Sequence, residues 1–204
     1  ACVVYARNAM WDAARSVGLK YFSVADDDYT SIKHRITPSG GYYGKVARNA
    51  DALFCAYIDF MRESGVDTIC FAQGGDYIGG VENQHVKGGF KHSRKMMNWY
   101  FFDVDKQIEF KGTINEDLTS SVTHGLTGGV ILTSYMSSID QKETQSNAGG
   151  LTEIYLELGT YVKSFYSVIA APSCVKVAAM GDPSLRIHHA VTWKNAVPKI
   201  IREC

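Results

Sequence analysis

Three consecutive aspartates close a short hydrophobic run, and we expect chemistry there first. Residues 19–25 read as a buried strand, and Asp26, Asp27 and Asp28 follow it directly. In open α/β sheets, ligands bind beyond the carboxyl ends of the strands. Asp26 and Asp28 have D-x-D spacing, and their hard oxygen ligands suit Mg²⁺ or Mn²⁺, which in turn would hold a diphosphate. A simpler interpretation, in which the acids cap a helix or solvate a turn, stays open.

A second acidic pair and a histidine pair stand far along the chain. Asn115 is followed by Glu116 and Asp117 at the expected start of a helix. Asp117, with Glu116 beside it, is our candidate general base for a hydroxyl acceptor, although acids also stabilise a helix start. His188 and His189 are neighbours on an expected strand, where successive side chains face opposite ways, so we expect one of them to reach a metal.

Polar residues at two further element ends could meet a nucleotide. Arg7 and Asn8 are expected to open a helix, where free backbone N–H groups could meet a phosphate; Asn8 could also be a plain N-cap. A second set ends another expected parallel strand and consists of Gln73, Gly74, Gly75 and Asp76. It should lie on the same sheet edge as the aspartates, where glycine lets a ligand approach the backbone. A purely conformational role for the glycines is the alternative.

A basic cluster precedes two aromatic residues and is a candidate surface for binding phosphates and bases. It consists of Lys87, Lys91, His92, Arg94 and Lys95, with Trp99 and Tyr100 soon after. Basic groups and aromatic rings could hold phosphates and stack on a base extruded from a duplex. The candidate acceptor contacts are therefore Lys91, Arg94, Lys95 and Trp99. A solvated charged loop is the alternative.

Alternating helices and strands must position these residues. We expect helices over residues 8–17, between Asn49 and Gly65, after Asn115, and over residues 151–170. The remaining pattern predicts strands over residues 19–25, 68–72, 130–134, 174–179 and 185–191, a hairpin of 99–104 with 108–113, and mobile loops at 37–44, 83–90 and 141–150. Such alternation indicates an α/β fold with a mixed, mainly parallel sheet flanked by helices.

Length and composition bound the molecule. Its 204 residues, 46% of them hydrophobic, suit a single domain over residues 1–204. Basic and acidic residues number 21 each, so the formal net charge is zero. We therefore expect no overall electrostatic attraction to nucleic acid or to an anionic membrane. Five scattered cysteines favour a reducing, cytoplasmic compartment, and neither a membrane span nor a secretion signal is indicated. Residues 2–6 resemble a strand that begins without a preceding segment. We therefore expect this sequence to be the remainder of a longer protein.

The order of the motifs resembles the GT-A glycosyltransferases. In that family an Arg-Asn pair opens a helix, a strand ends in a metal-binding D-x-D, an x-E-D motif supplies the base of inverting members, and a C-terminal histidine ligates the metal. The matching positions here are Arg7-Asn8, Asp26-Asp27-Asp28, Asn115-Glu116-Asp117 and His188-His189. More closely, residues 7–14, 71–76, 159–166 and 186–189 are similar to the bacteriophage glycosyltransferases found with TET/JBP-type dioxygenases.

This resemblance implies an enzyme of DNA hypermodification, in which the oxygenase makes a 5-hydroxymethylpyrimidine and the transferase adds a sugar to the new hydroxyl. It implies a nucleotide-sugar donor such as a UDP-sugar, a divalent cation (Mn²⁺ or Mg²⁺), DNA containing 5-hydroxymethylcytosine, and the cytoplasm of a phage-infected bacterium. Because Asp117 offers a base, we expect inversion. Of the N-terminal βαβ unit that GT-A folds usually have, we expect at most the last strand in this sequence. Alternatives are a protein, glycan or small-molecule acceptor, a non-catalytic binding module, and a nucleotidyltransferase.

Overall fold

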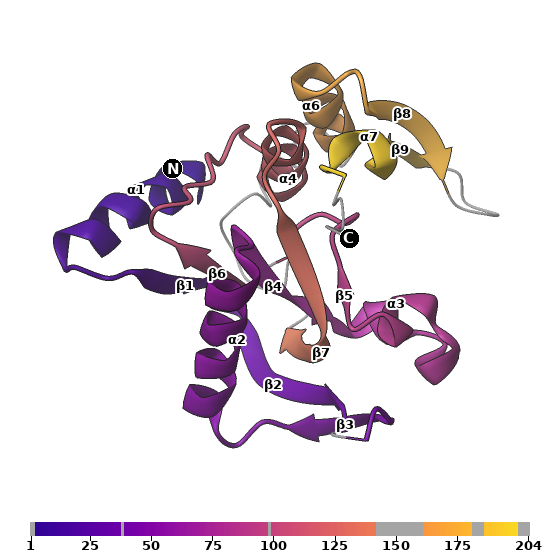
Figure 1. Ribbon diagram of the computed structural model, residues 1–204. Helices are drawn as coiled ribbons and strands as arrows, with labels where there is room; N and C mark the ends of the chain where they lie inside the picture. The colour runs from indigo at the N-terminus through magenta and orange to yellow at the C-terminus, as the bar shows by residue number, and fades with distance from the viewer. Residues whose placement is uncertain (1–2, 38, 98, 142–160, 181–185, 200–204) are drawn as a thin grey trace.

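The computed structural model describes residues 3–37, 39–97, 99–141, 161–180 and 186–199, which form helices around two sheets (Figure 1). The larger sheet has seven strands: β1 (Tyr21–Ala25), β2 (Tyr29–Ile36), β3 (Tyr42–Val46), β4 (Thr68–Gln73), β5 (Phe90–Lys91), β6 (Trp99–Asp103) and β7 (Ile131–Gln141). The smaller sheet pairs β8 (Val175–Met180) with β9 (Arg186–Val191). The helices are α1 (Val3–Ser16), α2 (Ala50–Ser64), α3 (Gln84–Lys87), α4 (Glu116–Leu126), α6 (Val162–Ala170) and α7 (Trp193–Ala196), with short turns η1 (Gly74–Tyr77) and η2 (Gly80–Glu82).

The larger sheet is mixed, with strand order β1-β6-β4-β7-β2-β3 and β5 beside β7. Within the described segments, only β4 and β7 pair in parallel, and the other neighbours are antiparallel. The expected α/β fold with a mixed sheet is confirmed, but the expectation of mainly parallel pairing was wrong. β1 and β4 do run in the same direction; β6, which arrives later in the chain, lies between them and runs the opposite way.

Position in the sheet also explains why the predicted hairpin of residues 99–104 with 108–113 was wrong. β6 has β1 on one side and β4 on the other, so no edge is left for a hairpin partner. Residues 108–113 form no strand; Ile108 and Phe110 are instead buried in the core. The predicted loop 37–44 was also partly wrong, because Tyr42 begins β3, and the predicted loop 83–90 contains α3.

Helix ends follow the sequence signals unevenly. Asn49 accepts a hydrogen bond from the backbone N–H of Ala52, and Gly65 ends α2 at φ 70°, as predicted. Gly18 likewise follows α1 at φ 72°. The predicted strand over residues 2–6 was wrong, because α1 begins at Val3. Of the helix predicted over residues 151–170, the structure describes the part from Tyr161 onward, in which α6 begins at Val162, and of the loop predicted over 141–150 it describes only Gln141.

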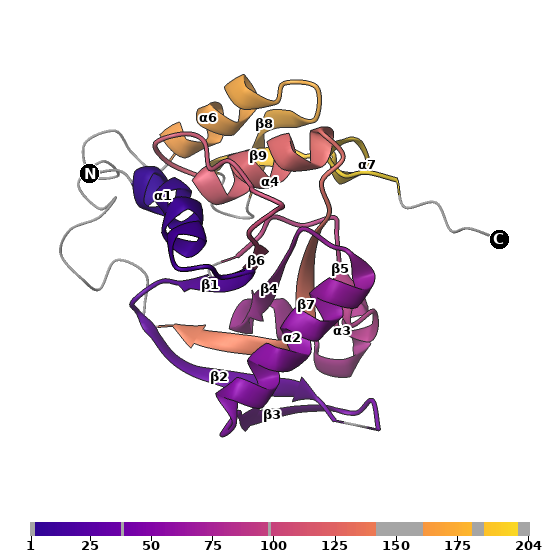
Figure 2. The same cartoon turned by 60° about the vertical axis from the view of Figure 1, so that its left-hand side comes forward.

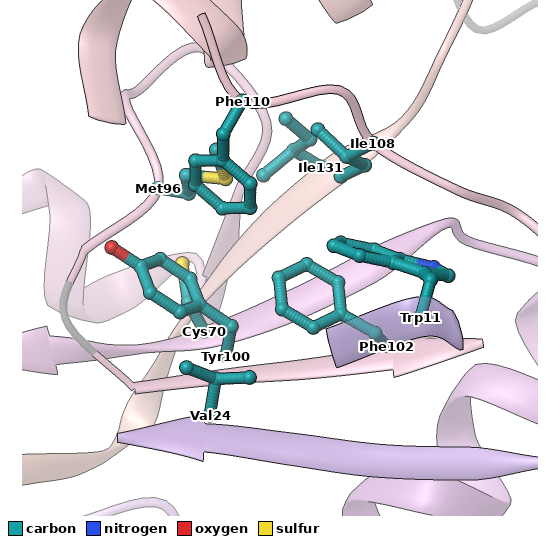
Figure 3. Close-up of a cluster of buried hydrophobic side chains, with 9 residues drawn as sticks. All are labelled: Trp11, Val24, Cys70, Met96, Tyr100, Phe102, Ile108, Phe110 and Ile131. Atoms are coloured by element: carbon teal, nitrogen blue, oxygen red, sulfur yellow. The ribbon is translucent and has the colours of Figure 1, made fainter. Parts of the chain in front are cut away.

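The sheet buries both of its faces, with α1 on one side and α2 on the other (Figure 2). Successive residues of β4 alternate between them: Cys70 belongs to the cluster with Trp11 of α1, and Ile69 and Phe71 to the cluster with Tyr57 of α2. Figure 3 shows the first cluster, which comprises Trp11, Val24, Cys70, Met96, Tyr100, Phe102, Ile108, Phe110 and Ile131.

A third cluster packs the C-terminal elements onto α4. It joins Leu118 and Val122 of α4 to Ala171, Val175 and Ala196. Helix α4 therefore lies between the large sheet and the unit formed by α6, β8, β9 and α7 (Figure 1). Among the helices of the described segments, of which α2 with 15 residues is the longest, none combines the length and hydrophobicity of a bilayer span.

Candidate active site

Strands β1, β4 and β7 run in the same direction and end at a common edge of the large sheet. The expectation that residues 73–76 share this edge with the aspartates is confirmed by hydrogen bonds. Gln73, at the end of β4, donates through Nε2 to Oε1 of Gln141 at 3.4 Å. Gln141, at the end of β7, donates through Nε2 to Oδ2 of Asp28 at 2.7 Å. Two amide side chains thus link the ends of β4 and β7 to the aspartate segment after β1.

The three aspartates have different surroundings. Asp26 accepts hydrogen bonds from Arg7 Nη2 at 3.2 Å and from the Tyr29 hydroxyl at 3.3 Å. Burial raises the pKa of Asp26, although the Arg7 guanidinium opposes this effect and nearby Asp28 adds to it. Asp27 is exposed. Asp28 keeps its Oδ1 buried without a hydrogen-bond partner in the described part of the chain. Asp28 therefore differs from Asp26 in having one buried carboxylate oxygen that no described group satisfies.

Arg7 connects the first acidic motif to the second. Its Nη1 donates to Oε1 of Glu116 at 2.6 Å, while Nη2 reaches Asp26. The guanidinium lies 5.3 Å from the ring centroids of Tyr100 and Phe110 and is almost fully buried. A single cation therefore holds carboxylates that are 90 residues apart in sequence, Asp26 and Glu116.

The prediction that Arg7 and Asn8 open a helix was wrong, because both lie inside α1. Asn8 exchanges two hydrogen bonds with the backbone of Phe110, donating to its carbonyl at 2.9 Å and accepting from its N–H at 2.8 Å. Asn8 thus fastens the segment after β6 onto α1, and the helix-terminus argument for a phosphate contact does not apply to either residue.

Helix α4 begins with two acidic residues, Glu116 and Asp117, whose pKa values are shifted in opposite directions. Burial raises the pKa of Glu116, even though Arg7 opposes it. Burial would also raise the pKa of Asp117, but an ion pair with Lys95 outweighs it and holds this pKa below its ordinary value. Asp117 Oδ1 in addition accepts the backbone N–H of Leu118 at 2.7 Å. Asp117 is therefore ionised at neutral pH, as a general base must be.

Asn115 holds the start of α4 against the C-terminal unit. The residue precedes the helix as predicted, but its φ of 60° is left-handed and its side chain does not cap the helix. The side chain instead donates to Ser167 Oγ at 2.5 Å and lies 3.4 Å from His189 Nδ1. This contact brings one of the two predicted histidines to the start of α4.

The two histidines are close to each other, with ring centroids 4.2 Å apart. His188 Nδ1 contacts the backbone oxygen of His189 at 2.9 Å. Burial, together with His188 and Lys95, lowers the pKa of His189 to about 4, so its imidazole is neutral at pH 7. Within the described ranges, no three His, Cys, Asp or Glu side chains gather as a metal-binding group. The predicted ligands Asp26, Asp28, His188 and His189 are thus not brought together as one set.

The turn after β4 is open on its glycine side. A Cβ atom at Gly74 or Gly75 would meet no heavy atom within 4 Å, so a ligand has room to approach this backbone. Asp76, in contrast, is occupied. It accepts the backbone N–H of Gln73 at 2.9 Å and pairs with Arg94 Nη2 at 2.6 Å.

The predicted acceptor contacts are largely engaged inside the molecule. Arg94 pairs with Asp76 and Lys95 with Asp117, so acids neutralise both cations. Trp99 stacks on Tyr29 at a centroid distance of 5.7 Å and packs in the α2-side core. Burial and the charge of Arg94 lower the pKa of Lys91. A basic stretch in sequence is therefore not a free basic surface here.

Sequence reasoning missed Gln141 and Tyr29, which contact the aspartates directly. Gln141 is the last residue of β7, as Gln73 is the last residue of β4. The predicted strand ended at residue 134, however, and so excluded Gln141.

Comparison with known protein families agrees with the motif order. Residues 1–150 match the family model described as TET-associated glycosyltransferase. No significant match was found among curated proteins or among solved structures. The matched region, 150 of 204 residues, contains both acidic motifs and ends before the histidine pair. The family predicted from the motifs is confirmed: the chain belongs to the TET-associated glycosyltransferases.

Proposed function

We propose that this protein is a metal-dependent glycosyltransferase that moves a sugar from a nucleotide-sugar, such as a UDP-sugar, to the hydroxyl of 5-hydroxymethylcytosine in phage DNA. The observation that carries the proposal is the bridge from Asp26 through Arg7 to Glu116. This bridge brings the strand-end D-x-D close to the helix-start acid pair, which supports a single GT-A-like site. The family's association with TET enzymes supports the acceptor, and the reaction would take place in the cytoplasm of the infected host.

Asp28 and Asp26 would hold the divalent cation. The fit rests on Asp28, whose Oδ1 is buried and unpartnered among the described residues, and on the hard carboxylate oxygens that Mg²⁺ and Mn²⁺ prefer. When bound, the cation would neutralise the diphosphate leaving group. His188 and His189 are not grouped with these aspartates in the described residues, so we assign the cation to the aspartates alone. The open backbone at Gly74 and Gly75, next to Gln73 and Asp76, would receive the donor nucleotide.

Asp117 would act as the general base. The acceptor oxygen bonds to the anomeric carbon as the bond from that carbon to the diphosphate breaks, and the electron pair leaves with the nucleoside diphosphate. Asp117 takes the hydroxyl proton, and Glu116, tied to Arg7, keeps the helix start in place. Because Asp117 offers a base, we expect inversion, and product that retains the donor's anomeric configuration would contradict it.

The decisive test is mass spectrometry of DNA that contains 5-hydroxymethylcytosine, incubated with the protein, Mn²⁺ and a panel of nucleotide-sugars. We expect a hexose or pentose mass gain with one donor, and none on matched DNA containing cytosine. Asp117→Asn and Asp28→Asn should each abolish the gain. No gain with any donor would overturn the DNA assignment.

A second acceptor class has one observation in its favour. Arg94 and Lys95 are already neutralised by Asp76 and Asp117, which suits a protein, glycan or small-molecule acceptor better than a polyanion. Nucleotide-sugar hydrolysis that depends on Asp28, together with no transfer to DNA, would favour this class.

A further inference from the structure

The carboxylate of Asp28 is held by one oxygen only. Its Oδ2 accepts the 2.7 Å hydrogen bond from Gln141 Nε2, while Oδ1 is buried and has no partner among the described residues. An unmatched buried oxygen costs free energy unless another group satisfies it. The hydrogen bond to Oδ2 therefore fixes which oxygen remains available for a cation.

Chain topology explains how Gln141 reaches Asp28. Residues 26–28 cross the sheet edge from the end of β1 to the start of β2, and Tyr29 pairs with Gln141 across the β2·β7 ladder. Asp28 is therefore placed beside the last residue of β7, although β6 and β4 separate β1 from β7 in the sheet.

Gln73 supports the orientation of the Gln141 amide that the carboxylate of Asp28, which only accepts hydrogen bonds, requires. Its Nε2 donates to Oε1 of Gln141, and an amide whose oxygen is engaged by a donor presents its NH₂ group at the other end. The 3.4 Å distance makes this the weaker of the two bonds. Gln73, Gln141 and Asp28 thus form a chain of two hydrogen bonds, in which Gln73 supports Gln141 and Gln141 holds Asp28.

We infer that Gln141, supported by Gln73, is a positioning residue that presents Asp28 Oδ1 to the divalent cation. This inference rests on the proposed function, because it needs a cation at Asp28. Partners that orient metal ligands typically change metal affinity about 10–100-fold when removed. Gln141 itself touches neither cation nor sugar in this role; it acts through Asp28.

The test measures Mn²⁺ binding in the presence of UDP by electron paramagnetic resonance. This readout does not depend on turnover. Gln141→Leu should weaken Mn²⁺ binding about 10-fold or more, and Gln73→Leu should weaken it less. Gln141→Asn, which keeps the amide on a shorter side chain, should recover part of the loss. The matched control is Gln107→Leu, since Gln107 accepts a hydrogen bond from Arg15 on the exposed surface and has none to residues 26–28 in the described part of the chain; its Mn²⁺ affinity should equal that of the wild type.

The outcomes separate the inference from the proposed function. Wild-type binding that Asp28→Asn abolishes and Gln141→Leu leaves unchanged would overturn the inference alone. Wild-type protein that does not bind Mn²⁺ would contradict both. A lower unfolding temperature with unchanged Mn²⁺ affinity would show that Gln141 is only a structural tie. If Gln141→Leu does not fold, Gln141→Asn and Gln73→Leu decide: Mn²⁺ affinity equal to that of the wild type in both variants would overturn the inference.

Discussion

At the scale of single residues, Arg7 is the side chain on which the two acidic motifs depend. Its guanidinium is buried and binds both Asp26 and Glu116, whose own pKa values burial raises. Breaking a buried ion pair by removing one partner leaves uncompensated charge. The arginine selected from the sequence as a phosphate contact is thus, in the folded molecule, an internal counter-ion.

We predict that Arg7→Met lowers the free energy of unfolding by about 3–5 kcal/mol at pH 7, measured by urea denaturation. Because the pKa values of both carboxyl groups are raised in the folded protein, protonation of these groups at low pH stabilises the fold. This contribution is lost as pH rises through the folded pKa. The deficit should therefore shrink toward pH 4, where Asp26 and Glu116 can take up protons.

The control lies on the same helix. Arg15 is half-exposed and pairs with exposed Asp12, so Arg15→Met should cost less than about 1 kcal/mol. Equal losses in the two variants, or a deficit for Arg7→Met that does not vary with pH, would contradict the role given to Arg7.

Lys95 sets the protonation of the proposed base. Its ammonium holds the pKa of Asp117 below its ordinary value against the effect of burial. In Lys95→Met this pKa should rise, so the acid limb of the kcat/KM profile should move to higher pH. The ion pair also contributes to the free energy of unfolding. In the wild type it stabilises the fold above the ordinary carboxyl pKa, and that contribution is lost as pH falls.

Lys87→Met is the matched control for Lys95, because Lys87 pairs with Glu82 on the surface. Its pH profile should coincide with that of the wild type. An acid limb that does not move in Lys95→Met would show that Asp117 is not the group that titrates.

At the scale of elements, α4 carries the proposed base into place and depends on a close contact at its other end. A Cβ atom at Gly125 would lie 2.1 Å from the backbone oxygen of Ala196. Gly-to-Ala inside a helix ordinarily stabilises by about 1 kcal/mol, but here the backbone of α7 stands in the way.

We predict that Gly125→Ala destabilises the protein by about 1–3 kcal/mol in urea denaturation, because the overlap must push α7 away from α4. Gly75→Ala meets no atom within 4 Å and should change stability by less than about 0.5 kcal/mol. A stabilised Gly125→Ala variant would show that α7 does not pack against α4 as described.

At the scale of the whole molecule, binding and folding should be linked. Mn²⁺ with UDP at 100 times its Kd should raise the free energy of unfolding by about 2.7 kcal/mol, visible as a higher Tm. Asp28→Asn should remove this gain, whereas Asp12→Asn on the exposed face of α1 should keep it. An equal gain in both variants would place the ligand away from the aspartates.

The sequence alone was sufficient for the family, for the helix between Asn49 and Gly65, and for the common edge that carries the aspartates and residues 73–76. These features depend on local patterns: glycine and asparagine at helix ends, continuous apolar strands, and acids directly after a strand. The physical causes of these patterns act over a few residues, so the patterns can be recognised in the sequence.

Tertiary structure alone decided which strands are neighbours and which charges meet. Insertion of β6 between β1 and β4 removes the parallel pairing and the hairpin that local patterns favour, because strand neighbours are chosen by packing across the whole sheet. Partners far apart in the chain turned Arg7 and Lys95 from expected ligand contacts into internal counter-ions. An ion pair forms where folding brings two groups together, and no local pattern in the sequence specifies that distance.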